Sequence, residues 1–366
     1  MARTWDESDV RIRPNKKGSR PRTKDRPSHE DAAVGRIITV DRGRYTAVVD
    51  EDTPRERVVI AARARELRRT PVVAGDFVAL VGDVSGRPDT LARLVRVEER
   101  RTLLRRSADD TDPVERVVVA NADQLVIVVA TANPEPRTGF IDRALVAAYD
   151  AGIEPLLLVT KADLKDPAEL LENYRHLDLT VVVSRAAASA EPDEEEPGGS
   201  TPLDEEALSR LHELLEGHVS VLLGHSGVGK STMVNALTGS RRATGGVNAV
   251  TGRGRHTSSS ALALRLADAA GGSWIIDTPG IRSFGLAHVD PDRILKAFPD
   301  LAPGTDFCER GCKHDADAVN CGLDRWVAEG SAGDAGPSRL ASLRRLLGAG
   351  VRTENRAEAK ELGTVQ

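Results

Sequence analysis

The sequence predicts a multidomain α/β protein made of three successive parts. Five short strand-like segments come first, strands and helices alternate from about residue 116, and a cysteine cluster with a helical stretch rich in Arg and Leu ends the chain. A length of 366 residues suggests two or three domains. We place a basic arm at 1–32, a β domain at 33–108, an α/β domain at 109–286 and a helical, cysteine-bearing domain at 287–366.

Composition is ordinary for a globular protein. Apolar residues make up 40% of the chain and charged residues 29%. Aromatic residues are only 3%, so the core must consist mainly of Val, Leu, Ile and Ala. No apolar run approaches the roughly 20 residues of a membrane-spanning helix. Residues 11–26 are polar where a secretory signal would be apolar, so we expect a cytoplasmic protein.

The net charge of −5 conceals two charged blocks. Residues 11–26 carry eight basic side chains against one acid, Asp25, and residues 191–206 carry eight acids and no base. Such blocks are typical of solvent-exposed tails and linkers. We interpret the acidic block as a linker, and the basic arm as either a solubilising tail or an RNA-contacting segment.

The first domain has the pattern of a small closed β-barrel. Its strands are expected at 34–40, 44–50, 57–63, 76–82 and 90–99. The five-stranded candidate is the OB-fold, and a barrel of another kind is the alternative. Only Tyr45 and Phe77 are available to stack on bases, so contact with a nucleic-acid backbone is favoured over base reading.

The α/β domain alternates strands and helices in the manner of a mostly parallel sheet. The run 125–130 is continuously apolar, as expected of a strand covered on both faces. An antiparallel hairpin is expected at 262–266 and 273–277. Further strands are expected at 155–160, 180–184 and 219–224, and helices at 140–151 and 203–216.

The strongest single motif is the glycine-rich segment 224–231, Gly-His-Ser-Gly-Val-Gly-Lys-Ser, which matches the P-loop pattern in full. An apolar strand precedes it and a helix follows, so its backbone N–H groups can surround phosphate oxygens. Lys230 is expected to reach the β- and γ-phosphates, and Ser231 to bind Mg²⁺. The predicted nucleotide-binding residues here are Gly224, His225, Ser226, Gly227, Val228, Gly229, Lys230, Ser231 and Thr232.

A second phosphate-side element, Asp-Thr-Pro-Gly, follows the strand that ends at Asp277. Asp277 is expected to hold the Mg²⁺ shell through water, and the Gly280 N–H to sense the γ-phosphate. The acid-free segment 239–267 lies between the two phosphate elements, where switch I is expected. Thr257 is the predicted Mg²⁺ ligand within it.

Guanine selection is predicted from Thr-Lys-Ala-Asp at 160–163, directly after a strand. The Asp163 carboxylate can accept from N1–H and the exocyclic amine of guanine, which adenine does not offer. Lys161 is expected to pack along the base, and Thr160 replaces the usual Asn. Ser184 is placed near guanine O6, although Arg185 replaces the Ala that usually follows.

The order of these elements is reversed relative to ordinary GTPases, because the guanine-side elements precede the phosphate-side ones. A sheet can be cut and rejoined at surface loops without losing its spatial arrangement. The sequence therefore predicts a circularly permuted P-loop GTPase domain.

All three cysteines lie in one segment together with a histidine, in the spacing C-x₃-C-x-H-x₆-C. Three thiolates and one imidazole suit a closed, tetrahedral, structural Zn²⁺ site. The odd cysteine count disfavours disulfides. The predicted ligands are Cys308, Cys312, His314 and Cys321, with replacement of His314 by another ligand as the alternative.

Taken together, these motifs resemble the RsgA (YjeQ) family of small-ribosomal-subunit-dependent GTPases. The resemblance covers roughly 33–325 and includes the domain order of OB-fold, permuted GTPase and zinc domain. The chain departs from the family in Arg185 and in its zinc spacing, which is commonly C-x₄-C-x-H-x₅-C. The matching segments are 140–143 (Phe-Ile-Asp-Arg), 160–163, 224–231, 254–257 (Gly-Arg-His-Thr) and 277–280.

The resemblance implies a factor for late maturation of the small ribosomal subunit that contacts rRNA and hydrolyses GTP when that subunit stimulates it. Separately, we expect the protein to be monomeric. It also supports Thr257 as the switch I residue. Ile281 stands where many GTPases carry a water-orienting Gln, so another group must orient the water. We hypothesise that His256 does so; the alternative is that it contacts phosphate backbone. Competing functions are an RNA scaffold that binds GTP with little turnover, an ATPase, and a permuted GTPase acting on another RNA particle.

Overall fold

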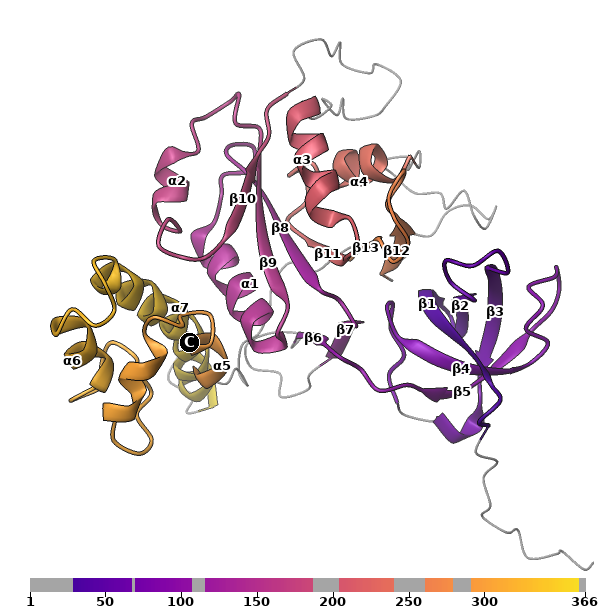
Figure 1. Ribbon diagram of the computed structural model, residues 1–366, viewed down its shortest axis with the longest axis horizontal. Coiled ribbons are helices and arrows are strands. Elements are labelled where there is room, and N and C mark those ends of the chain that lie inside the picture. The colour runs from indigo at the N-terminus through magenta and orange to yellow at the C-terminus, as the bar shows by residue number, and fades with distance from the viewer. Residues whose placement is uncertain are drawn as a thin grey trace, which may run out of the picture. The chain divides into compact units, whose positions relative to one another are not determined.

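The computed structural model describes residues 29–67, 70–106, 116–186, 204–239, 261–278 and 291–361 (Figure 1). The chain divides into a short N-terminal unit, Met1–Asp31, and a second unit, Ala32–Gln366, that holds the secondary structure described below. The basic block and the acidic linker up to position 203 lie outside the described residues. Among the described helices, none is long and apolar enough to cross a membrane.

The predicted five-stranded barrel is confirmed. Each strand is hydrogen-bonded in the order β1-β2-β3-β5-β4, and β4 pairs again with β1, which closes the sheet. All pairings are antiparallel except the parallel pair β3–β5. Inward side chains such as Ile37, Val78 and Leu94 form its core. The strands are β1 (Ala33–Asp41), β2 (Arg44–Val49), β3 (Arg57–Arg63), β4 (Phe77–Gly82) and β5 (Ala92–Val97).

The α/β domain contains the predicted parallel sheet, in the order β10-β9-β8-β11-β13. β12 pairs antiparallel with β13, as expected for the hairpin. Every residue of β8 and of β11 is buried, which agrees with strands covered on both faces. The strands are β8 (Gln124–Ala130), β9 (Glu154–Thr160), β10 (Thr180–Val183), β11 (Val219–Leu223), β12 (Leu262–Arg265) and β13 (Trp274–Asp277).

Helices cover this sheet on both faces. One face packs with α1 (Thr138–Ala151) and with C-terminal residues, and the other with α3 (Glu205–Leu215) and α4 (Lys230–Thr238). A short helix, α2 (Ala168–Glu172), follows β9. The carboxyl ends of the parallel strands meet at one edge, where α/β proteins bind ligands. A two-stranded sheet of β6 (Leu103–Arg106) and β7 (Arg116–Ala120) has one strand on each side of the predicted boundary at 108/109 and was not predicted.

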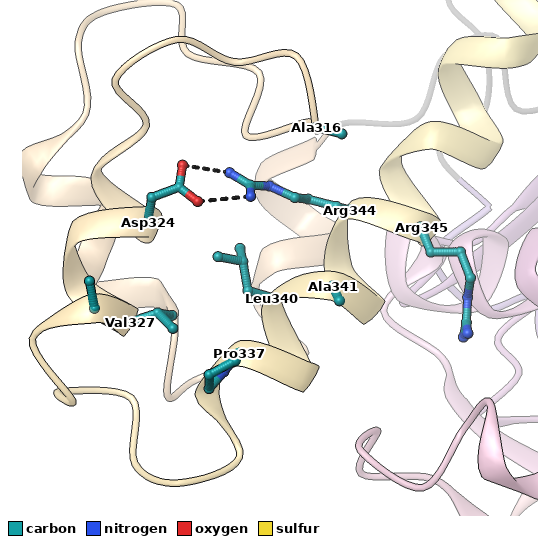
Figure 2. A pocket seen from close by; sticks show the side chains of 9 residues that line it. Ala316, Asp324, Val327, Pro337, Leu340, Ala341, Arg344 and Arg345 are labelled. Carbon is teal, nitrogen blue, oxygen red and sulfur yellow. Dashed lines mark hydrogen bonds and ion pairs between the residues drawn. The ribbon is translucent and has the colours of Figure 1, made fainter.

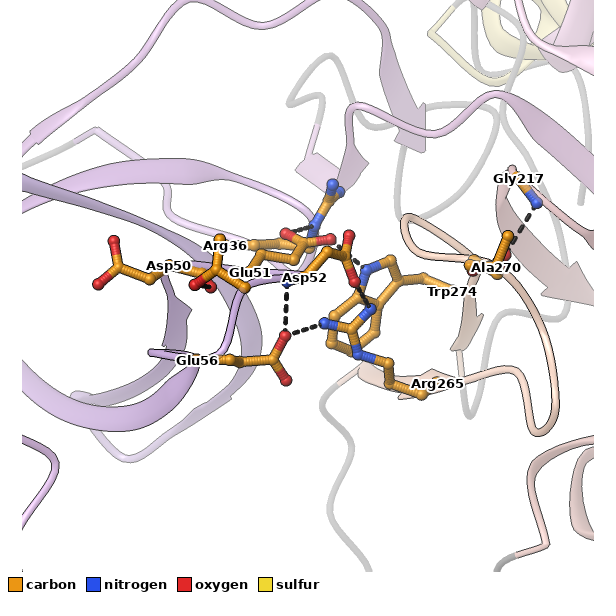
Figure 3. A network of polar contacts seen from close by, with 11 residues as sticks. Arg36, Asp50, Glu51, Asp52, Glu56, Gly217, Arg265, Ala270 and Trp274 are labelled. Carbon is orange, nitrogen blue, oxygen red and sulfur yellow. Dashed lines mark hydrogen bonds and ion pairs between the residues drawn. The ribbon is translucent and has the colours of Figure 1, made fainter.

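Polar contacts join the loop between β2 and β3 to the β12–β13 hairpin (Figure 3). The Arg265 guanidinium lies 2.6 Å from an Asp52 carboxylate oxygen and also contacts Glu56. The indole N–H of Trp274 donates to Glu51 at 2.6 Å, and Arg36 pairs with the same carboxylate at 2.8 Å. The contacts of Arg265 and Trp274 link residues more than 200 positions apart in the sequence.

The C-terminal part is helical, with α5 (Pro291–Leu295), the 3-10 helix η3 (Ala302–Phe307), α6 (Gly322–Ala328) and α7 (Gly336–Glu361). The stretch 339–360 is therefore a helix, and Leu343 and Leu346 of α7 are fully buried in the cluster that contains α1. A cavity of about 630 Å³ lies between α6 and α7, where Arg344 forms a bidentate ion pair with Asp324 (Figure 2). The predicted multidomain α/β class is thus confirmed.

Candidate functional site

The P-loop lies between β11 and α4, as predicted. Gly227 and Gly229 have φ values of 82° and 94°, in the left-handed region that favours glycine. A Cβ atom on Gly224 would lie 2.5 Å from the Val128 carbonyl oxygen, so no larger residue fits there. Gly229 is the N-cap of α4, which places the positive end of the helix at this loop.

Lys230 turns back into the loop, where its ammonium group donates to the carbonyl of Gly224. Burial lowers the pKa of Lys230, and the nearby Asp277 carboxylate opposes that shift. A partly buried ammonium is well suited to a phosphate, because an anion offsets the cost of removing the charge from water. Ser231 is exposed at the start of α4 and Thr232 is half-buried.

The second phosphate-side element lies beside the P-loop strand. Asp277 is in register with Leu222 of β11 in a parallel pair. The buried hydroxyl of Thr278 donates to the Leu222 carbonyl at 2.7 Å and holds the end of β13 against β11. The Asp277 carboxylate lies near enough to Lys230 to act on it electrostatically, so the two residues predicted for the phosphate side lie in one region.

Thr160 connects the guanine-side element to the P-loop. Its hydroxyl is buried and lies 2.8 Å from the carbonyl oxygen of Val228 and 3.2 Å from that of Val129. Thr160 and Val228 are 68 positions apart in the chain. The residue that departs from the usual Asn thus makes a direct polar contact with the phosphate-binding loop.

The loop after β8 also contributes to this site, and sequence reasoning missed it. The Lys161 ammonium donates to the carbonyl of Asn133, and the Thr131 hydroxyl donates to the carbonyl of Lys161. The Pro134 ring lies 3.8 Å from where a Cβ atom of Gly227 would be. The Asn-Pro dipeptide after a buried strand was the available signal that a turn begins there.

Hydrogen bonds from the backbone join the segment that carries Asp163 to the segment that carries Ser184. Ser184 is buried; its N–H donates to Val159 and its carbonyl accepts from Ala162 at 3.0 Å. The N–H of Ala186, two residues after Ser184, donates to a carboxylate oxygen of Asp163 at 2.8 Å. Asp163 itself is exposed at the carboxyl edge of the sheet.

His225 of the P-loop packs against Phe140 at the start of α1, with ring centroids 4.4 Å apart. This contact ties the phosphate-binding loop to α1, which precedes β9. Three predicted site residues, His256, Thr257 and Gly280, lie outside the described residues, as does Ile281.

The four predicted metal ligands converge. Their ligand atoms all lie within 4.8 Å of one another, and Cys321 and His314 are buried. The His314 Nδ1 atom lies 3.5 Å from the Cys308 sulfur and 3.6 Å from the Cys321 sulfur, and those two sulfurs are 4.0 Å apart. Ideal tetrahedral Zn²⁺ coordination places two sulfurs about 3.8 Å apart and sulfur and nitrogen about 3.6 Å apart. Cys308, Cys312, His314 and Cys321 therefore fit a zinc ion.

A neighbouring backbone group supports the same cluster. The N–H of Gly322 donates to the Cys308 sulfur at 3.1 Å, a contact that favours a thiolate at this position. A Cβ atom on Gly322 would lie 2.5 Å from the Gly304 carbonyl, so the close approach requires glycine. The cluster could hold a metal ion without taking part in nucleotide chemistry.

The fold and the site together define a class. A parallel sheet carries a P-loop on its β11–α4 turn, and the base-side elements on β9 and β10 come earlier in the chain, so the domain is a circularly permuted P-loop GTPase domain. The family model described as RsgA GTPase matches residues 97–287, just over half of the chain. The chain belongs to the RsgA GTPase family.

Curated relatives agree with this assignment. The small ribosomal subunit biogenesis GTPase RsgA of Pseudomonas aeruginosa strain LESB58 is 40% identical over 238 residues, a match that covers 63% of each chain. The protein of the same name from Neisseria meningitidis serogroup C is 37% identical over 233 residues, covering 62% of this chain and 67% of that one. The match thus spans somewhat less than two thirds of the Pseudomonas protein.

Two solved structures share the fold. YjeQ from Thermotoga maritima superposes with a TM-score of 0.56 at 22% identity, covering 87% of this chain and 98% of that one. YloQ, described as a circularly permuted GTPase, gives a TM-score of 0.56 at 20% identity over 88% of this chain and 97% of that one. At such identities the likeness concerns the fold alone.

Proposed function

We propose that this protein hydrolyses GTP to GDP and phosphate and that the small ribosomal subunit stimulates the reaction. The observation that carries the proposal is the contact between Thr160 and the Val228 carbonyl, which brings a guanine-type element and a P-loop into one site. Family membership and the names of the relatives support the same reading.

Nucleotide is bound from two sides in this proposal. Lys161, Asp163 and Ser184 hold the guanine, and the loop 224–232 with Lys230 holds the phosphates. Ser231 and Thr257 are the proposed Mg²⁺ ligands, with Asp277 acting through water. A bound Mg²⁺ ion neutralises charge on the β- and γ-phosphates. The Cys308, Cys312, His314 and Cys321 cluster holds one structural Zn²⁺ ion in this proposal, and its spacing supports that role.

The partner is proposed to be the small ribosomal subunit and its rRNA, with GTP hydrolysis assisting late maturation. The relatives' names connect those proteins with small-subunit biogenesis. The β1–β5 barrel is the proposed rRNA-facing domain, because small barrels of this topology commonly bind nucleic acid. We further propose that the protein acts as a monomer, in the cytoplasm with the ribosome.

Hydrolysis requires a water-orienting group, and Ile281 cannot provide one. We propose that His256 orients the attacking water once rRNA orders the switch I segment. Replacement of His256 by Ala should then abolish subunit-stimulated turnover and leave GDP binding intact. Unchanged stimulated turnover would instead assign His256 to backbone contact.

The experiment measures GTP hydrolysis by the purified chain alone, with small ribosomal subunits and with large ribosomal subunits. ATP in place of GTP is the control. Stimulation of at least about 10-fold by small subunits only is the expected result, because activators supply missing catalytic groups to slow GTPases. GTP binding without stimulated turnover would indicate an RNA scaffold, and stimulation by another particle would change the partner. Equal use of ATP would contradict the guanine site.

A further inference from the structure

Asp204 makes more contacts than the start of a helix requires. It is the N-cap of α3, and its Oδ1 atom accepts from the Ala207 N–H at 2.8 Å. Its second oxygen, Oδ2, accepts from the Arg185 N–H at 2.6 Å and from the Ser184 hydroxyl at 3.3 Å. The Asp204 N–H also donates to the Arg185 carbonyl at 3.2 Å. One side chain therefore serves both the helix and the segment 184–186.

The helix that carries Asp204 is fixed to the sheet. Leu211 and Leu215 are fully or almost fully buried in the core between the parallel sheet and the helices α3 and α4. At the far end of α3, the Leu214 carbonyl accepts from the Gln124 side chain at 3.0 Å. His212 contacts the Ala267 carbonyl at 2.7 Å. A carboxylate on so firmly held an element has a fixed position, as a positioning group needs.

The segment 184–186 lies directly against the guanine-selecting carboxylate. The Ala186 N–H donates to Asp163 Oδ1, and so occupies one oxygen and fixes the plane of that carboxylate. Arg185, the neighbouring residue, is held at both its N–H and its carbonyl by Asp204. The contacts thus run from Asp204 through the backbone of Arg185 and Ala186 to Asp163.

The same contacts span a long connection. Arg185 and Asp204 are 19 positions apart, and most of the acidic block lies between them. Apart from its contacts with Asp204, the segment 184–186 is hydrogen-bonded to Val159, Ala162 and Asp163, in and just after β9. Burial raises the pKa of Asp204, yet the hydrogen bonds from Arg185, Ala207 and Ser184 leave it lowered overall. The carboxylate is accordingly ionised, as a double acceptor must be.

We propose that Asp204 is a positioning residue for guanine selection, which orients the Asp163 carboxylate through the backbone of the segment 184–186. This inference rests on the proposed function, because it assumes that guanine nucleotide binds at Asp163. Arg185, which looks like a departure from the usual short element, is compatible with the site because its backbone rather than its side chain makes these contacts.

The discriminating ligand pair is GDP and inosine diphosphate (IDP), which differ only in the exocyclic amine that Asp163 would accept from. Asp204→Ser keeps an N-cap oxygen for Ala207 but is too short to reach Arg185 as well. We expect this variant to retain its melting temperature while the ratio of GDP to IDP affinity falls roughly three- to tenfold, the effect of one weakened hydrogen bond. Competition against a fluorescent GDP analogue measures both affinities.

A matched control is Asp166→Ser. Asp166 accepts from the Ala168 N–H at 3.0 Å at the start of α2, and it lies in the same half of the domain. Its replacement should leave the GDP-to-IDP ratio unchanged. Asp204→Asn is a second test variant, because one amide oxygen cannot serve both Ala207 and Arg185, and it should also lower the ratio.

The outcomes separate this inference from the proposed function. If the wild-type chain prefers GDP and the Asp204 variants keep the same ratio, or lose GDP and IDP affinity equally, the positioning role is overturned and the guanine site stands. If the wild-type chain does not bind GDP, the proposed function fails and this inference fails with it. A reduced ratio in both Asp204 variants, with the Asp166 control unchanged, supports the role.

Discussion

The hydroxyl of Thr160 donates a hydrogen bond to the Val228 carbonyl oxygen at 2.8 Å, and this bond joins the proposed guanine-side element to the P-loop. Both residues are buried, and the chain separates them by 68 positions in an order opposite to that of ordinary GTPases. The permuted domain thus places these two elements in contact although their order in the sequence is reversed.

Replacement of Thr160 by Val tests this contact. The substitution keeps the shape of the side chain but leaves the Val228 carbonyl without this hydrogen bond. The free energy of unfolding should fall by about 1–3 kcal/mol. We expect GDP affinity to fall by about tenfold, measured by titration calorimetry. The control is Thr238→Val, which removes a hydroxyl bond of similar length to Val234 within α4. Equal loss of affinity in both variants would show that the Thr160 contact has no special role.

Lys230 should destabilise the nucleotide-free protein. Burial lowers its pKa, so the folded chain binds fewer protons at this site than the unfolded chain. The free energy of unfolding should therefore rise as pH increases from the lowered pKa toward the ordinary lysine value of about 10.4. Below the lowered pKa, the full cost of burying the charge is present.

Lys230→Met should remove this pH-dependent rise, and it should not lower the melting temperature of the nucleotide-free chain at neutral pH. It should also abolish the increase in melting temperature that GDP produces in the wild type. Lys165→Met is the control, since Lys165 is half-exposed and far less desolvated. A large drop in nucleotide-free stability for Lys230→Met alone would contradict the argument.

The cysteine cluster predicts one zinc ion for each chain. Cys321→Ser removes a buried ligand, so the purified variant should contain little zinc and its C-terminal helices should unfold at a lower temperature. Metal analysis and circular dichroism with and without a chelator measure both effects. The cluster would not be a metal site if the wild-type protein lacked bound metal after purification in zinc-containing buffer. The same would hold if the chelator left its circular dichroism and melting temperature unchanged.

Arg339 connects α7 to the rest of the molecule. Its guanidinium pairs with Asp300 at 2.7 Å and donates to the His176 carbonyl at 2.7 Å, and its side chain is only 12% exposed. Arg339→Ala should lower the free energy of unfolding by about 2–3 kcal/mol, because Asp300 loses its partner. Arg210→Ala, which breaks an exposed pair with Glu213, should cost less than about 1 kcal/mol. If urea unfolding gave a similar loss in the free energy of unfolding for both variants, the larger contribution of the Arg339 pair would be refuted.

Sequence patterns predicted most of the strands because their signals are local. The apolar run around Val126 and the left-handed backbone of Gly227 and Gly229 are explained by neighbours within a few positions, whereas Gly224 is required by the Val128 carbonyl, which is distant in the sequence. The pair β6–β7 was missed since its strands are short and only half-buried at several positions. Strand pairing of this kind depends on partners that periodicity does not reveal.

The residues that carry recognisable motifs were found, and those that support them were not. Asp163 and Lys230 belong to patterns with a known spacing. Asp204 stands in an acidic block that reads as a linker, and its contact with Arg185 becomes visible only once α3 is placed on the sheet. Asn133 likewise joins the site through its backbone carbonyl, which side-chain chemistry could not indicate.

The most direct test of the central claim, that elements from both parts of the permuted domain form one guanine site, is the nucleotide preference of Asp163→Asn. Xanthine carries a carbonyl where guanine carries its exocyclic amine, and an Asn amide can donate to that carbonyl. We predict that GDP affinity falls by at least about 100-fold while affinity for xanthosine diphosphate rises, because an unpaired polar group in the site is costly. Unchanged GDP affinity in this variant would contradict the account, since guanine would then be bound elsewhere.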